Sequence, residues 1–360
     1  MVGVTDNPPA IAAFLTEPTR FLFFTGKGGV GKTSLACASA VHLADRGRRV
    51  LLVSTDPASN LDEVLVCHLG TQPTPIPGVE RLLALNIDPE AAAEAYREKL
   101  VGPYRGKLPE SVVRSMEEQL SGACTTEVAA FDEFSRLLGE AEATAGFEHV
   151  IFDTAPTGHT LRMMKLPAAW TGFLATNTTG NSCLGPLAGL EKQRATYARA
   201  VAAMVDPDRT TLVLVSRAQQ AALDEAERTS RELATVGATR QHLVLNGVFR
   251  ATNTTDSIAA ALERRGTEAI HRKAGFLAQI ATTEIPLHPR NLIGVSALRD
   301  LLGTKEPPDA PPPALPAALP PVETLSRLVD DLATAGRGVV MTMGKGGVGK
   351  STVSVNVAVA

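Results

Sequence analysis

The feature that most constrains this chain is an octapeptide that occurs twice, as GKGGVGKT at residues 26–33 and as GKGGVGKS at residues 344–351. Each copy fits the pattern G-x-x-x-x-G-K-[ST] and follows a short apolar run, Phe21–Phe24 in the first case and Val339–Thr342 in the second. Where such a loop joins a strand to a helix, its backbone N–H groups cradle phosphates. The repetition therefore predicts two related nucleotide-binding units in one chain.

The spacing of the two copies predicts the domain organisation. The second copy lies 318 residues after the first, and the sequence stops within the helix that should follow it. A strand, a loop and half a helix cannot bury their own apolar faces, so we expect the natural chain to continue. Between the units, residues 307–321 contain eight prolines, which favour an extended spacer. We predict a first unit at residues 1–302, a proline-rich linker at 303–322 and the truncated start of a second unit at 323–360.

Inside the first unit, short apolar runs bounded by turn residues alternate with longer segments of helical pattern. The runs are Phe21–Phe24, Val50–Val53, Leu82–Ile87, Val150–Phe152, Leu212–Val215 and Leu243–Leu245. They are continuous rather than alternating, as expected for strands buried on both faces of a parallel sheet. Segments such as Pro89–Leu100 and Gln219–Leu233 have helical spacing. This arrangement predicts an α/β fold with a mostly parallel sheet flanked by helices. The insert at about residues 89–146 lacks a strong strand signal and is predicted to be a helical subdomain.

Composition excludes several classes of protein. Lys and Arg number 35 against 38 Asp and Glu, a formal net charge of -3, so we expect no nucleic-acid partner bound through bulk charge. No apolar run approaches the length of a membrane-spanning helix, and the N-terminus has no secretory signal. Four cysteines in 360 residues do not make a disulfide framework. We expect a cytoplasmic chain whose contact with a membrane comes through a partner.

The first phosphate loop predicts specific roles for its side chains. Lys32 should reach the β- and γ-phosphates of ATP, and the hydroxyl of Thr33 should bind Mg²⁺. The helix that begins here adds positive potential at its N-terminus. The remaining residues predicted to hold the nucleotide are Gly26, Gly28, Gly29, Val30, Gly31 and Ser34.

Three polar residues follow other predicted strands. Asp56 and Asp153 come at the carboxyl ends of two buried strands, where open α/β sheets bind ligands. Asp56 is a candidate to orient the attacking water, and Asp153 a candidate for the Mg²⁺ shell. The alternative for each is a helix cap or an Asx-turn. Asn246 could bind an adenine edge through its amide, or simply form an Asn-Gly turn.

The phosphate loop contains a second lysine, Lys27, that an ordinary loop of this kind does not need. With it, the loop resembles the deviant Walker A class of P-loop NTPases, to which ArsA, MinD and the nitrogenase iron protein belong. In that class the extra lysine crosses a dimer interface. The resemblance implies that Lys27 serves the nucleotide of the second unit and that Lys345 serves that of the first, as in a pseudo-dimer. The alternative is a solvated loop lysine.

Further segments make the chain similar to the ArsA family, the arsenite- and antimonite-stimulated ATPases. They are STDPASN at residues 54–60, DTAPTGH at 153–159, and the stretches Leu120–Phe134 and Asn181–Arg194. The resemblance runs from about Arg20 to Ala360. It implies ATP hydrolysis that is stimulated by As(III) or Sb(III) and that energises metalloid efflux through a membrane pump. The partners it implies are that pump at the inner membrane, a metalloid chaperone and the second ATPase unit.

The same resemblance gives roles to two cysteines that spacing alone would leave as buried and inert. It implies that Cys124 and Cys183 are two of three thiols that bind the metalloid, the third belonging to the second unit. Soft thiolates suit such an ion. It also suggests that His159 links the nucleotide and metalloid sites as a switch. We expect Cys37 to lie in the core and Cys67 to be structural.

Two alternative functions share these loops. An ATPase that targets tail-anchored membrane proteins tends to carry a C-x-x-C zinc pair and a Met-rich groove, whereas this chain has no C-x-x-C and only 7 Met. A regulatory nucleotide switch of the MinD kind usually ends in an amphipathic membrane helix, which a truncated chain cannot test.

Overall fold

The computed structural model describes residues 13–56, 60–154, 187–253, 255–273, 275–302, 324–334, 337–344 and 349–359. For residues 13, 123, 124, 127 and 187–194 the description is confined to the backbone. The chain divides into two compact units, Met1–Thr304 and Lys305–Ala360.

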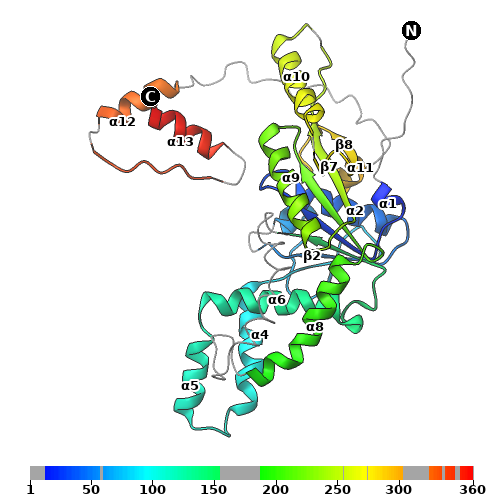
Figure 1. The fold of residues 1–360 in the computed structure, drawn as a ribbon, viewed down its shortest axis with the longest axis vertical. Helices are drawn as coiled ribbons and strands as arrows, with labels where there is room; N and C mark the ends of the chain where they lie inside the picture. Colours follow the sequence, from blue (N-terminus) through cyan, green and yellow to red (C-terminus); the bar gives the residue numbers. More distant parts are fainter. Residues whose placement is uncertain are drawn as a thin grey trace. The chain divides into compact units, whose positions relative to one another are not determined.

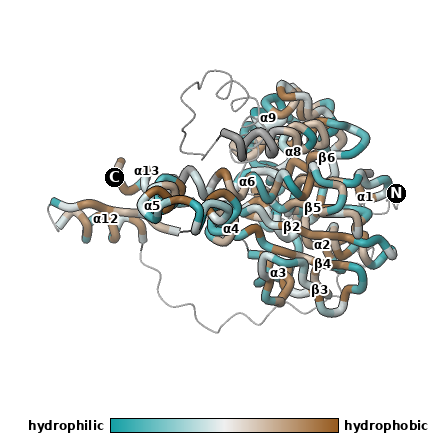
Figure 2. Tube along the Cα trace, turned by 90° about the horizontal axis from the view of Figure 1, so that it is seen from below, coloured by the Kyte–Doolittle hydropathy of each residue, from teal (hydrophilic) through white to brown (hydrophobic). Residues whose placement is uncertain are grey.

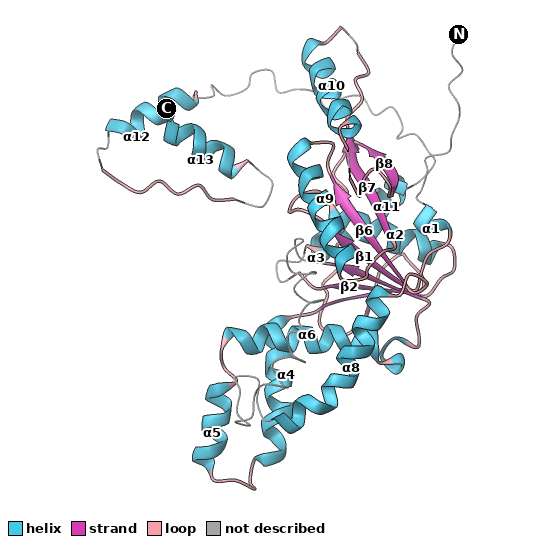
Figure 3. Cartoon of the chain, in the orientation of Figure 1, coloured by secondary structure: helices cyan, strands magenta, loops and turns pink. Residues whose placement is uncertain are grey.

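Within the described part of the larger unit, eight strands form one sheet in the order β3-β4-β2-β5-β1-β6-β7-β8 (Figures 1 and 3). Neighbouring strands are parallel, except that β3 runs antiparallel to β4. The strands are β1 (Phe21–Thr25), β2 (Val50–Ser54), β3 (Thr74–Pro75), β4 (Leu82–Asn86), β5 (His149–Asp153), β6 (Thr210–Ser216), β7 (Gln241–Val248) and β8 (Ala281–Pro286). The predicted α/β fold with a mostly parallel sheet is confirmed.

Helices cover both faces of this sheet. One face carries α1 (Ala13–Thr16), α2 (Lys32–Asp45), α3 (Leu61–Leu65) and α11 (Val295–Leu302). The other carries α6 (Ala123–Gly139), α8 (Leu187–Val205), α9 (Gln220–Thr235) and α10 (Ser257–His271). The Asp256 carboxylate caps α10 by accepting hydrogen bonds from the N–H groups of Ile258 and Ala259.

Alternate residues of each central strand pack against opposite helical layers. In β1, Leu22 and Phe24 face the α2 layer, while Phe21 and Phe23 face the α6 and α8 layer, and all four are at most 1% exposed. Figure 2 shows hydrophobic residues along the central strands and α2. This two-sided burial explains why the strands appear in the sequence as continuous apolar runs.

The insert between β4 and β5 is helical. It contains α4 (Pro89–Val101), η1 (Gly102–Tyr104), α5 (Glu110–Gln119), the start of α6 and η2 (Ala141–Thr144). Helix α4 begins where Asp88 caps its first turn and Pro89 occupies the first helical position. The subdomain has a small core of its own, formed by Ala93, Tyr96, Leu100, Val101, Val113, Leu120, Val128 and Ala129.

In the smaller unit, the structure describes α12 (Leu325–Thr334) and α13 (Lys350–Val359), the second of which begins within the second phosphate-loop motif. The apolar run Val339–Thr342 forms no strand, which corrects the sequence expectation. Val339 is 89% and Met341 78% exposed. A strand needs a hydrogen-bonded neighbour, and the described part of this unit offers none.

Candidate functional site

The candidate site lies where the parallel strands β1, β2 and β5 end together. In the register of the sheet, Asp153 of β5 lies beside Phe24 of β1 on one side and beside Ser54 of β2 on the other. Backbone hydrogen bonds fix the loops that leave these strands: the N–H of Thr55 donates to the carbonyl of Asp153 at 2.9 Å, and that of Thr154 to the carbonyl of Phe24 at 3.2 Å. These backbone contacts bring the ends of the three strands and the loops that leave them together.

The phosphate loop that follows β1 requires glycine at two tightly packed positions. Gly26 has a φ of 148°, and a Cβ there would overlap the carbonyl oxygen of Val215 in β6. Gly31 has a φ of 95°, and a Cβ there would overlap the side-chain amide of Asn246. Both residues therefore combine a conformation that favours glycine with a contact that excludes any side chain.

Asn246 supports the phosphate loop from β7. Its Nδ2 donates a 2.8 Å hydrogen bond to the carbonyl of Val30, and the residue is only 7% exposed. The amide nitrogen is thus committed to the loop backbone in this structure. The binding of an adenine edge by Asn246 stays a prediction, whereas its contact with the loop is a role that the sequence did not indicate.

Lys32 lies in the centre of the site and is 7% exposed. Its Nζ donates to the carbonyl of Lys27 at 3.3 Å. Burial lowers the pKa of this ammonium, and the carboxylates of Asp153, Asp56 and Glu225 act in the opposite direction. A buried ammonium group near carboxylates is suited to replace its interactions with them by interactions with the phosphates of a nucleotide.

The hydroxyl of Thr33 donates to Oδ2 of Asp153 at 2.8 Å. Asp153 is 1% exposed, and its other oxygen, Oδ1, has no hydrogen-bond partner among the described residues. Burial raises the pKa of this carboxyl group to about 6, against the hydrogen bond from Thr33 and the charge of Lys32. A buried, unsatisfied acceptor is costly and calls for a ligand.

These oxygens fit a hard divalent cation. Mg²⁺ prefers carboxylate and hydroxyl oxygens and usually keeps several of its waters. The buried Oδ1 of Asp153 offers an acceptor for such a water, and Thr33 offers its hydroxyl oxygen beside it. This donor set would suit Mg²⁺, and the predicted role of Thr33 and Asp153 in holding the cation stays a prediction.

Asp56 lies at the start of the loop that follows β2. Its backbone N–H donates to Oγ of Ser54 at 3.2 Å, and the residue is half-buried. Its charge raises the pKa of Asp153 and that of Lys32, so the carboxylate is close to both groups. Its role in orienting water stays a prediction, since the following residues 57–59 lie outside those described.

Lys27 makes an ion pair within its own unit. Its Nζ lies 3.6 Å from Oε2 of Glu225 in α9, with side-chain exposures of 45% and 22%. No sequence signal pointed to Glu225, which lies in an ordinary amphipathic helix far along the chain. The predicted partner of Lys27 is instead the nucleotide of the second unit, and Lys345 lies outside the described residues.

The predicted metalloid ligands are placed only in part. Cys124 lies in the first turn of α6, but its side chain is not described, and Cys183 and His159 lie outside the described residues. Among the residues that are described, no three His, Cys, Asp or Glu side chains form a metal-binding group. Cys37 is fully buried in α2, as expected, and burial raises the pKa of its thiol. Cys67 packs half-buried against the core.

No helix in the described part of the chain is long and apolar enough to cross a membrane.

Known proteins are similar to this chain in sequence. A family model described as anion-transporting ATPase matches residues 19–304. Proteins named arsenical pump-driving ATPase are similar: one from Acidiphilium multivorum is 52% identical over 94% of this chain and 58% of its own length. One from Escherichia coli is 51% identical over 96% of the chain and 60% of its own length. An ATPase get3 of Schizosaccharomyces japonicus is 29% identical over 81% of the chain and 94% of its own length.

The chain thus spans about three fifths of the length of the arsenical pump-driving relatives. The family match covers the whole sheet and the helical subdomain, including the phosphate loop and the Thr33–Asp153 contact. By this match and these identities, the chain belongs to the ArsA family of anion-transporting ATPases.

Proposed function

We propose that the chain is the first unit of an ATPase that is stimulated by As(III) or Sb(III) and energises metalloid efflux through a membrane pump. The observation that carries this proposal is its 51–52% identity, over 94–96% of its length, to proteins named arsenical pump-driving ATPase. The nucleotide site supports it, because a phosphate loop, a buried lysine and a carboxylate with an unsatisfied oxygen meet at one edge of the sheet.

In the proposed reaction, the chain's own groups bind and orient the nucleotide. The N–H groups of the loop from Gly26 to Thr33 receive the phosphates, and Lys32 moves from its backbone partner to the β- and γ-phosphates. Thr33 and Asp153 would hold Mg²⁺, which neutralises phosphate charge. Asp56 orients the attacking water by accepting a hydrogen bond from it. Phosphoryl transfer needs such positioning more than covalent chemistry.

Lys27 completes the site across the pseudo-dimer. Closure of the two units would carry its ammonium from Glu225 to the nucleotide of the second unit, while Lys345 would serve the first. A lysine in that position stabilises the charge that develops on the leaving phosphate. The partly exposed ion pair with Glu225 is weak enough to be exchanged, since such pairs contribute about 0–1 kcal/mol.

The proposed metalloid site joins the two units. Cys124 and Cys183 supply two thiolates and the second unit a third, so a bound ion favours the closed state. His159 would link this site to the loop that follows Asp153. The protein would act at the cytoplasmic side of the inner membrane, on the pump and with a metalloid chaperone as supplier.

The test is an arsenite titration of steady-state ATPase activity on the full-length protein, with its complete second unit. We expect strong stimulation of the wild type. Cys124→Ser and Cys183→Ser should blunt the response without abolishing basal hydrolysis, because the nucleotide site is intact. Cys67→Ser is the matched control, since it changes a half-buried thiol without a predicted ligand role. Undiminished stimulation in both ligand variants would remove the metalloid site and favour the alternative, an ATPase that targets tail-anchored proteins.

A further inference from the structure

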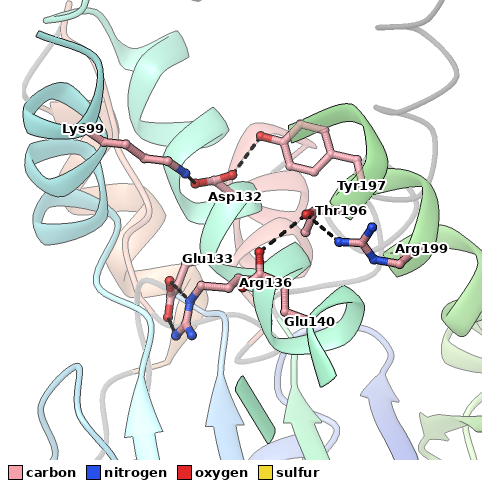
Figure 4. Close-up of polar contacts among 8 residues, drawn as sticks. All are labelled: Lys99, Asp132, Glu133, Arg136, Glu140, Thr196, Tyr197 and Arg199. Atoms are coloured by element: carbon pink, nitrogen blue, oxygen red, sulfur yellow. Dashed lines mark hydrogen bonds and ion pairs between the residues drawn. The ribbon is translucent and has the colours of Figure 1, made fainter. Parts of the chain in front are cut away.

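A single carboxylate joins three helices at the junction of the helical subdomain and the sheet (Figure 4). The hydroxyl of Tyr197 in α8 donates to Oδ1 of Asp132 in α6 at 3.0 Å. Lys99 in α4 donates to Oδ2 of the same carboxylate at 3.1 Å. Asp132 therefore binds α8 with one oxygen and α4 with the other.

The two bonds of Asp132 lie in different environments. Tyr197 is 3% exposed, with its ring centroid 5.0 Å from that of Phe131. Burial and the nearby charge of Asp132 raise the pKa of Tyr197, so its hydroxyl keeps the proton and donates. The Lys99 side chain, in contrast, is 57% exposed. A charge-assisted hydrogen bond to a buried hydroxyl is strong, whereas an exposed ion pair contributes little, so the bond of Asp132 to α8 is the stronger of the two.

A second contact brings α6 and α8 together backbone to backbone. A Cβ on Gly139 would lie 2.5 Å from the carbonyl oxygen of Thr196, so only glycine allows this approach. Arg199 secures it by donating to the carbonyl of Gly139 at 2.8 Å and to Oγ1 of Thr196 at 3.0 Å. The bond between Asp132 and Tyr197 is a second link between the same two helices, seven residues earlier in α6.

Space is available on the other side of α6. A pocket of about 350 Å³ lies between α6, α4 and the end of β4. Asp132 lines it together with Leu85, Ile87, Tyr96, Lys99 and Arg136. The boundary between α6 and α4 is therefore open beside Asp132, whereas nearer the start of α6 Val128 and Ala129 pack into the subdomain core with α4.

Helix α6 also contacts the two strands that lead to the nucleotide site. The ring of Phe134 lies 5.3 Å from that of Phe152 and 5.9 Å from that of Phe23, and Phe152 stacks on Phe23 at 4.6 Å. Phe152 directly precedes Asp153, and Phe23 lies three residues before Gly26. A displacement of α6 therefore acts on the strands that carry the proposed Mg²⁺ ligand and the phosphate loop.

The two cysteines predicted to bind the metalloid lie close to these helices in the sequence. Cys124 lies in the first turn of α6, eight residues or about 12 Å before Asp132 along the helix. Cys183 lies four residues before the start of α8 in sequence. An ion that binds both thiols would pull on α6 and on the chain that leads into α8.

We propose that Asp132 and Tyr197 are a positioning pair that makes α6 and α8 move as one body, so that metalloid binding reaches the Phe152–Asp153 strand end. This inference rests on the proposed metalloid-stimulated ATPase function. In this proposal the two side chains bind neither nucleotide nor metalloid. They determine how strongly metalloid binding raises the ATPase rate.

The test compares Tyr197→Phe with the wild type in the full-length protein, using Sb(III) as the probe. The variant keeps the ring on Phe131 and removes only the hydroxyl. We expect basal ATPase and Sb(III) binding, measured by equilibrium dialysis, to stay within about twofold, while the ratio of stimulated to basal rate falls about fivefold. Asp132→Asn should lower the ratio in the same direction. Lys99→Met and Tyr104→Phe, the latter at an exposed tyrosine of the subdomain, should leave it unchanged.

The outcomes separate the two proposals. Wild-type protein that Sb(III) does not stimulate would overturn the proposed function and this inference with it. A stimulated wild type with an unchanged ratio in Tyr197→Phe and Asp132→Asn would overturn the positioning pair alone. A loss in Lys99→Met as large as in Tyr197→Phe would overturn the assignment to the α6–α8 contact. A lower melting temperature with an unchanged ratio would show a merely structural bond and would likewise overturn it.

Discussion

Thr33 and Asp153 are joined by a 2.8 Å hydrogen bond between a hydroxyl and a carboxylate that lie 120 residues apart in sequence. One side chain belongs to the first turn of α2 and the other to the end of β5. The contact holds the start of the phosphate-loop helix against the neighbouring strand. It leaves Oδ1 of Asp153 without a partner among the described residues, in a place where a cation-bound water would satisfy it.

Thr33→Ala should lower Mg²⁺-dependent ATP hydrolysis by about 100-fold, because it removes the hydroxyl oxygen proposed to bind the cation. Thr33→Ser, which keeps that oxygen, is the matched control and should retain most of the activity. Turnover of both variants over a Mg²⁺ titration checks this. Equal activity of the Ala and Ser variants would exclude the hydroxyl from the site.

Asp56→Asn should preserve ATP binding within about twofold and lower turnover by about 100-fold, because an amide cannot orient the water as the carboxylate does. Glu63→Gln is the control, since it removes an acid from α3 on the same stretch of chain. Binding of a fluorescent ATP analogue and steady-state turnover separate the two effects. Unchanged turnover would remove Asp56 from the mechanism.

Glu225→Gln should raise the basal ATPase rate of the full-length protein about two- to fivefold, because it releases Lys27 from the ion pair in its own unit. Lys27→Ala should lower hydrolysis, and the double variant should behave like Lys27→Ala, since no lysine remains to be released. Asp224→Asn, at the adjacent acid of α9, should change nothing. A basal rate that Glu225→Gln leaves unaltered would show that the pair does not hold Lys27 back.

His242 should make the larger unit less stable in weak acid. Burial lowers its pKa from 6.5 to about 4, and its Nε2 lies 2.7 Å from Oγ1 of Thr283. Between pH 6.5 and about pH 4, this histidine is protonated in the unfolded chain but not in the folded chain. The free energy of unfolding therefore decreases as the pH falls below 6.5.

For His242 we expect a loss of about 2 kcal/mol of unfolding free energy between about pH 7 and about pH 5. Urea denaturation at both values should show this loss in the wild type and in His271→Gln, which changes an exposed histidine of α10. His242→Gln should show a smaller pH dependence. An equal slope in all three proteins would contradict the assignment.

The sequence predicted the strands that are buried on both faces, because each forms a continuous apolar run. It missed β3, with two residues, and β8, where exposed Glu284 alternates with buried Thr283 and Ile285. Edge strands contribute one face at most to the core, so their composition is mixed. The order of the strands could not be predicted from the sequence either, since it depends on pairing across the sheet.

The sequence could predict the phosphate loop, Asp56 and Asp153 as candidates for one site. Each follows a buried strand, and the carboxyl ends of parallel strands meet at one edge of the sheet. Contacts between distant helices had no such signal. Tyr197 and Asp132 are 65 residues apart, and each occupies a helix in which the residue type has no distinctive pattern. Glu225 is a similar case, since its approach to Lys27 depends on how α9 packs against the sheet.

The two outer strands of the sheet discourage association between copies of the protein. At one edge, β3 is only two residues long and ends in Pro75, which has no N–H to offer a further strand. At the other, β8 ends in Pro286 and carries Glu284, whose carboxylate pairs with Arg250 at 2.8 Å. Short length, proline and charge each oppose the addition of a foreign strand. At high protein concentration, these two edges protect the mostly parallel sheet against edge-to-edge aggregation with other copies.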